Sequence, residues 1–219
     1  ARGNAKRPRL LLTATSPAMT IVSHRGEIMK VQEMVEKNRS YRRFDASRPI
    51  EEKTLVELVD LARITPSAAN RQPLRYILSH SPDSNAKVFE ALGWAGYLPD
   101  WPGPSPEEQP TAYIIILVDK EISETAGFDC GIAAQTILLA AVEKELGGCM
   151  LANVKKNRLK ESFDIPDRYE IQLVIALGVP VEKVVLEKMG SDGSVKYYRD
   201  DKMVHHVPKR TLDEVIIKT

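Results

Sequence analysis

The sequence predicts a single domain that contains both helices and strands, and three stretches carry this prediction. Residues 51–63 repeat apolar side chains at helical spacing along one face. Residues 131–146 form a longer helical stretch that is apolar over more than half of its circumference. Residues 111–118 are a near-continuous run of branched and aromatic residues, which is typical of a strand buried on both faces. A chain of 219 residues with 43% hydrophobic content can bury the core that these elements need.

The remaining elements follow from the same periodicities. We expect a short helix at residues 29–37 and strands at residues 74–79, 148–151 and 171–177. Together with residues 111–118, these complete the strands that we expect. No internal repeat or low-complexity segment divides the chain.

The long helix has a candidate beginning and end. Asp129 is a potential N-cap, and Gly147 is expected to end the helix. About eighteen residues at 1.5 Å each make a rod of roughly 27 Å. Because its apolar residues surround most of the rod, we expect part of its burial to come from a second copy of the chain.

Composition excludes several classes of protein. The 31 lysines and arginines nearly cancel the 30 aspartates and glutamates, so bulk charge does not favour nucleic acid. Cys130 and Cys149 are the only cysteines, and their setting supports neither a metal site nor a disulfide framework. No run approaches the ~20 apolar residues that cross a bilayer. We expect a cytoplasmic protein with no nucleic-acid or membrane partner.

Residues 1–28 differ from the rest of the chain. Five basic residues face a single glutamate there, a net charge of +4, beside a short apolar run at residues 10–12. A transit peptide, a translated leader and a basic arm all remain open. We interpret residues 1–28 as an extension outside the core and residues 29–219 as the functional domain.

Two short motifs carry most of the chemical information. The first motif, residues 38–44, reads Asn-Arg-Ser-Tyr-Arg-Arg-Phe, and the second motif, residues 66–73, reads Pro-Ser-Ala-Ala-Asn-Arg-Gln-Pro. Guanidinium groups grip phosphate through two hydrogen bonds, and a serine hydroxyl adds a donor. Asparagine and glutamine each offer a donor and an acceptor, which suits the edge of a heterocycle such as the pyrimidine portion of flavin. A solvated arginine face and a simple connecting loop remain open alternatives for the two motifs.

Residues 93–110 form a proline-rich loop that contains both tryptophans. Trp94, Tyr97 and Trp101 stand among five prolines, which exclude a helix or a central strand. A local aromatic cluster and a substrate-covering lid are both open interpretations.

Several common catalytic signatures are absent from the sequence. It contains no Gly-x-Gly-x-x-Gly, no P-loop, no Gly-x-Ser-x-Gly and no His-Glu-x-x-His, and no acid–base pair stands out. His205 and His206 are adjacent, so an extended chain directs them to opposite sides, which disfavours a shared metal. This pattern fits an enzyme whose cofactor carries the reaction.

The order of the two motifs resembles the FMN-dependent nitroreductase family. The family's first motif, Arg-Ser-x-Arg-x-Phe, is kept at Arg39, Ser40, Arg42 and Phe44. Its second, Pro-Ser-x-x-Asn-x-Gln-Pro, is kept at Pro66, Ser67, Asn70, Gln72 and Pro73. The resemblance continues through residues 131–148, 171–180 and 208–210, and covers roughly residues 29 to 216.

The resemblance implies an α+β fold, a mostly antiparallel central sheet flanked by helices, in a homodimer with FMN at the interface. It also implies an oxidoreductase in which NAD(P)H delivers a hydride to flavin N5. Electrons then pass to a nitroaromatic or quinone-like acceptor in a ping-pong cycle. No side chain is expected to be catalytic, because the chemistry is borne by the flavin.

The resemblance assigns roles to particular residues. It places Arg39, Ser40, Lys209 and Arg210 at the FMN phosphate, and Arg42 on the N1–O2 side of the ring. For the ring itself it implies edge contacts from Asn70 and Gln72, and close backbone from Pro66, Ser67 and Ala68. Leu151, Ala152 and Asn153 match a loop beside the flavin, and the candidate substrate residues are Trp94, Tyr97 and Trp101.

Two positions depart from the family pattern, and other functions remain open. Asn38 stands where many relatives carry a second basic residue, and Leu74 where many carry tryptophan. A reductive dehalogenase of a halogenated phenol would use the same fold. A non-catalytic flavin-binding protein and an FMN-free interaction module are further alternatives.

Overall fold

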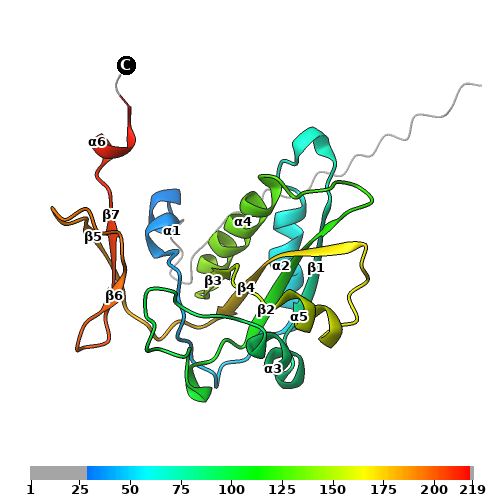
Figure 1. Ribbon diagram of the computed structural model, residues 1–219, viewed down its shortest axis with the longest axis horizontal. Helices are drawn as coiled ribbons and strands as arrows, with labels where there is room; N and C mark the ends of the chain where they lie inside the picture. Colours follow the sequence, from blue (N-terminus) through cyan, green and yellow to red (C-terminus); the bar gives the residue numbers. More distant parts are fainter. Residues whose placement is uncertain (1–28, 218–219) are drawn as a thin grey trace, which may run out of the picture.

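The computed structural model of the chain describes residues 29–217 and shows an α+β domain (Figure 1). Its main sheet has four antiparallel strands in the order β1-β2-β4-β3. These strands are β1 (Leu74–Ser79), β2 (Ala112–Asp119), β3 (Gly147–Leu151) and β4 (Tyr169–Gly178). The predicted strands are confirmed, to within two residues at each end. The proposed extension at residues 1–28 lies outside the described residues.

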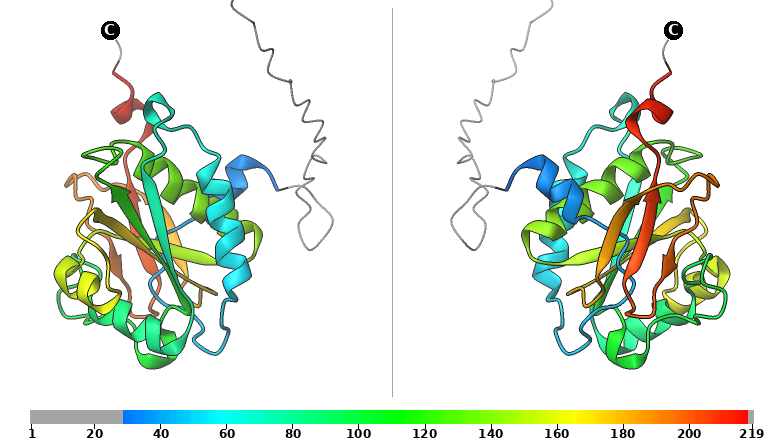
Figure 2. Two further views of the ribbon diagram at one scale, coloured as in Figure 1. Left: turned by 90° about the vertical axis from the view of Figure 1, so that its right-hand side faces the viewer. Right: turned by 90° about the vertical axis from the view of Figure 1, so that its left-hand side faces the viewer.

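Helices cover both faces of this sheet (Figure 2). Helices α2 (Glu52–Arg63) and α4 (Asp129–Glu143) pack on one face, and α3 (Pro82–Glu90) and α5 (Lys156–Ser162) on the other. The described residues also form α1 (Val31–Lys37), α6 (Leu212–Val215) and the short 3₁₀ turns η1 (Ala68–Asn70) and η2 (Pro106–Glu108). The predicted helices correspond to α1, α2 and α4. The sequence analysis did not anticipate α3, α5 and α6, which are short and carry several polar residues.

Strand β2 is the centre of the core. All eight of its residues are buried, and the side chains of residues 112–118 alternate between two apolar clusters. Ile114 and Ile116 pack with α2 and α4 on one face. Tyr113 and Ile115 pack with α3 and α5 on the other. The near-continuous apolar run therefore reflects burial on both faces.

The beginning and end of α4 correct two expectations. Asp129 is not the N-cap, because it lies inside the first turn and its carboxylate accepts hydrogen bonds from Ser67 Oγ at 2.6 Å and Ala68 N at 3.0 Å. Gly147 does not end the helix but begins β3. The chain instead turns at Glu145, whose φ of 57° lies in the left-handed region.

A second, smaller sheet was missed by the sequence analysis. It consists of β5 (Val184–Lys188), β6 (Tyr198–Arg199) and β7 (His205–Lys209), and the β5–β7 pair is parallel. The sheet and α6 stand beside the main body (Figures 1 and 2). These strands are short and rich in charged residues, so no run of apolar residues marks them. The expected list of strands was therefore incomplete.

Phe44 of the first motif anchors the start of the domain. It is fully buried, its amide donates to Glu108 O at 3.0 Å, and it forms a bridge with Pro180. A Cβ added at Gly178 would lie 2.8 Å from the Phe44 side chain. The glycine at the end of β4 therefore leaves room for the phenyl ring.

We expect Phe44→Ala to lower the free energy of unfolding by about 3–5 kcal/mol, because it leaves a cavity in a core that cannot fully collapse. Urea denaturation measures this loss. Phe44→Leu keeps most of the buried volume and serves as the control with a smaller loss. Equal losses for the two variants would contradict this account of the site.

Candidate functional site

The first motif and the closing basic residues line one groove of about 740 Å³, which we call the anion groove. It lies between the end of α1, the middle of α4, β3 and the smaller sheet. The polar side chains that line it are those of Asn38, Arg39, Ser40, Arg42, Gln135, Tyr197, His205, Lys209 and Arg210. Four of these side chains are cationic, and none of the described lining residues is acidic. The groove therefore favours an anionic ligand.

Backbone contacts hold the first motif against β3. Ser40 forms a parallel bridge with Gly148, and the Tyr41 amide donates to Gly148 O at 3.0 Å. A Cβ added at Gly147 would lie 2.5 Å from the Tyr41 ring. The absence of a side chain at Gly147 thus allows the motif to approach β3 closely.

Unpartnered polar atoms gather in the anion groove. Within residues 29–217, five buried side-chain nitrogen or oxygen atoms lack a hydrogen-bond partner, and three belong to groove residues. These are Arg39 Nε, Arg42 Nε and His205 Nδ1. Buried polar groups in native proteins are nearly always paired. The groove therefore presents donors that suit a polar ligand.

Arg42 is buried, with 9% of the residue exposed, and lines the groove. Its guanidinium donates to Ser40 O at 3.2 Å and lies 3.5 Å from His205 Nε2. Its central carbon is 4.9 Å from the Tyr197 ring centroid. No ion pair with a described carboxylate neutralises this guanidinium. Its positive charge therefore remains available in the groove.

Buried Glu182 organises the surroundings of Arg42. One carboxylate oxygen accepts from the Arg42 amide at 2.9 Å. The other accepts from Arg199 Nε at 3.1 Å and Nη2 at 2.7 Å. The carboxylate therefore contacts the backbone of the first motif while its charge is paired with Arg199.

The two adjacent histidines have opposite surroundings, and the prediction that they face opposite sides is confirmed. Burial lowers the pKa of His205 to about 4, and the nearby Arg42 acts in the same direction. Because a guanidinium only donates, the His205 Nε2 that faces Arg42 is the acceptor and the neutral ring carries its proton on Nδ1. His206 lies between Glu187 and Asp200, and hydrogen bonds to these carboxylates raise its pKa.

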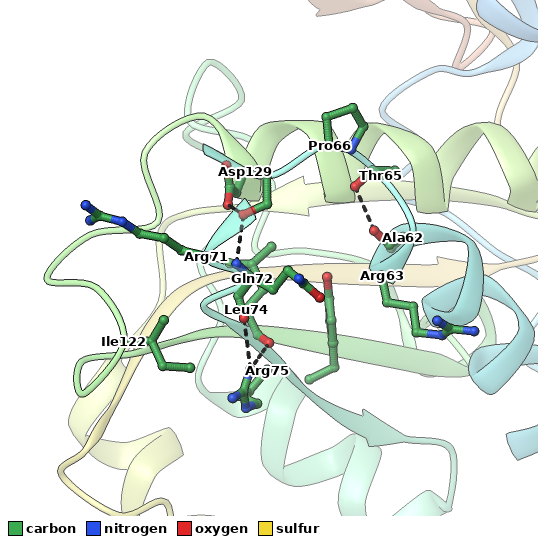
Figure 3. A pocket seen from close by; sticks show the side chains of 12 residues that line it. Ala62, Arg63, Thr65, Pro66, Arg71, Gln72, Leu74, Arg75, Ile122 and Asp129 are labelled. Carbon is green, nitrogen blue, oxygen red and sulfur yellow. Dashed lines mark hydrogen bonds between the residues drawn. The ribbon is translucent and has the colours of Figure 1, made fainter. Parts of the chain in front are cut away.

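The second motif lines a different cavity, of about 420 Å³ (Figure 3). Pro66, Ser67 and Gln72 contribute to it, and Figure 3 shows Gln72 between Asp129 and Arg75. The Asp129 carboxylate holds the motif through its bonds to Ser67 and Ala68.

The backbone of the second motif is unusually compact. Ala69, Asn70 and Gln72 have φ values of 51°, 53° and 52°, in the left-handed region. The Gln72 amide nitrogen Nε2 donates to Asn70 Oδ1 at 3.1 Å, and the Gln72 backbone N donates to Ser67 Oγ at 2.9 Å. The two carboxamides are therefore preorganised as a pair at an exposed turn.

One copy of the chain does not bring the two motifs into one cavity. Asp129, at the start of α4, lines the second-motif cavity, whereas Gln135 and Leu138 of the same helix line the anion groove. These positions are about 9 to 14 Å apart along the helix axis, from the rise per residue.

The remaining predicted site residues lie elsewhere. Leu151 is buried in the core, whereas Ala152 and Asn153 are exposed, and none of the three lines either cavity. The Trp94 ring packs on Phe89 and against the edge of Trp101.

Tyr97 reaches from the 93–110 loop toward the anion groove. Its ring lies 5.0 Å from the ring of Tyr197, and its amide donates to the Tyr197 hydroxyl at 3.3 Å. The two tryptophans therefore form a local aromatic cluster, while Tyr97 contacts a groove residue. A substrate role for all three stays a prediction.

Burial disfavours the thiolate form of both cysteines. Burial raises the pKa of the Cys130 thiol to about 11 and also raises that of Cys149. Within residues 29–217, no three histidine, cysteine or acidic side chains cluster as metal ligands. No helix in this part of the chain is long and apolar enough to cross a membrane.

The sequence analysis missed four residues around Arg42, namely Tyr197, Glu182, Arg199 and His205 as a groove residue. Nothing local could reveal Glu182, because its contact with Arg42 spans 140 positions.

Comparisons with known proteins agree with the α+β fold. A family model described as the nitroreductase family matches residues 35–102 and 104–179. The chain therefore belongs to the nitroreductase family, and the resemblance seen in the sequence is confirmed.

Individual relatives support this assignment. The "Putative NADH dehydrogenase/NAD(P)H nitroreductase" of Methanothermobacter thermautotrophicus is 28% identical over 182 residues, covering 80% of this chain and 90% of that protein. A nitroreductase family protein of Streptococcus pneumoniae superposes with a TM-score of 0.63 at 17% identity, over 87% of this chain and 100% of that one. A structure from Exiguobacterium sibiricum, solved in complex with FMN, has a TM-score of 0.60 at 17% identity, over 70% and 90% of the two chains. The two structures confirm the predicted nitroreductase-like α+β fold.

The two histidines predict opposite effects of pH on stability. The pKa of His205 is lower in the folded chain than its ordinary value of 6.5, so its contribution is fully present above pH 6.5 and is lost as the pH falls toward about 4. The pKa of His206 is raised, so its contribution is present below pH 6.5 and is lost as the pH rises through the folded pKa.

Thermal denaturation between pH 4 and 8 tests these signs in His205→Asn and His206→Asn. We expect the His205 variant to lose less stability than the parent on acidification, because it has no buried imidazole to protonate. The His206 variant should be weakened mainly at low pH. Identical pH profiles for the two variants would show that their environments do not differ.

Proposed function

We propose that this protein is an FMN-dependent oxidoreductase that takes a hydride from NAD(P)H and reduces nitroaromatic or quinone-like acceptors. The observation that carries the proposal is the anion groove, where the first family motif and the closing basic pair converge with unpartnered donors. The relative's name as an NAD(P)H nitroreductase and the neighbour's complex with FMN support the donor and the cofactor.

The residues of the groove fit the phosphate end of a flavin mononucleotide. Arg39, Ser40, Lys209 and Arg210 offer charged or hydroxyl donors, and no acidic residue lines the described groove to repel a phosphate. The unpartnered Arg39 Nε provides one donor that a phosphate oxygen would satisfy. Arg42 lies deeper and would place positive charge beside the N1–O2 edge, where reduction adds negative charge.

The second motif suits the flavin ring, at the end of FMN opposite the phosphate. Asn70 and Gln72 offer carboxamides on a compact turn that Asp129 holds through Ser67 and Ala68. Bound FMN would supply the redox chemistry, with the donor and the acceptor using it alternately in a ping-pong cycle. The protein would bind and orient the flavin without a catalytic side chain of its own.

We propose that two copies of the chain complete each site. The two motifs line separate cavities in one copy, and an exposed face of α4 runs between them. Phe128 is 88% exposed and Ile132 38% exposed on this face, while Val31 and Val35 are exposed on α1. Burial of these side chains would stabilise a homodimer. The first motif of one copy and the second motif of its partner would then meet at one flavin.

Complementation between two defective variants tests this arrangement. We expect Arg39→Ala and the double variant Asn70→Ala/Gln72→Ala each to lower FMN affinity about tenfold or more, since each loses hydrogen bonds to the ligand. If the motifs come from different copies, mixed dimers contain one intact site, and random mixing restores roughly a quarter of the high-affinity sites.

The two variants are unfolded together, refolded together and titrated with FMN by fluorescence, with separately refolded samples as the control. Recovery only in the mixture supports a shared site. A failure to recover, with mixed dimers detected by mass spectrometry, would place both motifs in a single-copy site. A monomeric parent would also contradict the proposed homodimer.

Steady-state kinetics test the activity itself. We expect the FMN-loaded protein to oxidise NADH or NADPH only when menadione or a nitroaromatic acceptor is present, with the parallel double-reciprocal lines of a ping-pong cycle. Bound FMN without turnover would indicate a non-catalytic flavin-binding protein. Turnover restricted to halogenated phenols would indicate the dehalogenase alternative.

A further inference from the structure

Glu182 lies beside Arg42 without neutralising its charge. The carboxylate is fully buried, and Oε2 accepts from the Arg42 amide at 2.9 Å. The Arg42 guanidinium instead contacts Ser40 O, His205 Nε2 and the face of the Tyr197 ring. The Glu182 carboxylate and the Arg42 guanidinium are thus both buried and close in the structure, but they do not form an ion pair.

Arg199 explains why they do not. Its Nε and Nη2 both donate to Glu182 Oε1, at 3.1 and 2.7 Å, and its side chain is only 8% exposed. Because an unpaired carboxylate is costly in the protein interior, Glu182 must have a cationic partner. Arg199 fills this role and leaves the guanidinium of Arg42 to the groove.

The 93–110 loop holds Arg199 in place. The Arg199 guanidinium carbon lies 4.1 Å from the centroid of the Trp101 ring, a cation–π distance, and the edge of Trp101 meets Trp94. Arg199 is therefore fixed between a carboxylate and an aromatic face. The tryptophans of the loop thereby support a residue that does not itself line the groove.

We propose that Arg199 is a positioning residue that occupies the Glu182 carboxylate and so keeps the Arg42 guanidinium available to the anionic part of a ligand in the anion groove. This inference rests on the proposed flavin function. Without Arg199, Glu182 would draw the Arg42 guanidinium toward itself, because its carboxylate already contacts the Arg42 amide and would otherwise lack a counter-ion. Binding the ligand would then require breaking a buried ion pair.

A rescue experiment separates this role from simple structural support. FMN affinity is measured by fluorescence titration of flavin-free protein for the parent, Arg199→Leu, Glu182→Gln and the double variant. We expect Arg199→Leu to bind FMN about tenfold more weakly, or worse, because its Arg42 charge is captured. Neutralising Glu182 removes the competitor, so the double variant should return to within about threefold of the parent.

Two controls show whether the loss of FMN affinity is specific to Arg199 and which part of FMN it concerns. Arg168→Leu removes an arginine from Asp119, another fully buried carboxylate that keeps Arg75 as a partner, and should leave FMN affinity unchanged. Riboflavin, which lacks the phosphate, identifies the part of the ligand that Arg42 meets. Weakening for FMN alone indicates the phosphate, and weakening for both ligands indicates the ring edge.

Parental FMN affinity in Arg199→Leu, or a double variant at least as weak as Arg199→Leu, would overturn the inference. If Arg199→Leu does not fold, the FMN affinity of Glu182→Gln tests the proposal by itself. Affinity at or above that of the parent supports the proposal, and a loss overturns it. A parent that binds no FMN would instead refute the proposed function, and the inference with it.

Discussion

The site depends on how the chain distributes its buried carboxylates. Asp119 is paired with Arg168 and Arg75, Glu182 with Arg199, and Asp129 accepts from the second motif. None of these buried acids forms an ion pair with a cationic side chain of the anion groove. Glu182 contacts Arg42 only through the backbone amide. A groove with unpaired guanidinium groups can persist in a nearly neutral protein only because its acids are already engaged.

The fold brings these groups together through its central strand and one long helix. Strand β2 is covered on both faces, so the surrounding helices have fixed positions. Helix α4 then extends from the second-motif cavity, at Asp129, to the anion groove, at Gln135 and Leu138. In the proposed homodimer, a partner copy would pack on the exposed part of this helix and join the two cavities.

The smaller sheet and the residues beside it line the groove and contact the 93–110 loop. On one side, Tyr197 and His205 face Arg42, and Tyr97 of the loop packs on Tyr197. On the other side, Tyr198 stacks on His206. The alternation of side chains along two short strands therefore separates a neutral, buried histidine from one that lies between carboxylates.

The sequence by itself determined the elements whose signals are local. Strand β1 lies at the predicted residues, β2 is displaced by a single residue, and the motifs with the family's spacing led to the correct family. These features depend on apolar periodicity or on neighbouring residues, so they can be recognised without knowing the fold.

Only the tertiary structure decided how the motifs are supported and where they lie relative to each other. Asp129 proved to hold the second motif rather than cap α4, and the smaller sheet was missed because its strands are short and polar. Glu182 contacts Arg42 across 140 positions, and Arg199 completes that contact from a separate strand. Such pairings depend on folding to bring distant residues together, and no local pattern of the sequence encodes which buried acid neutralises which base.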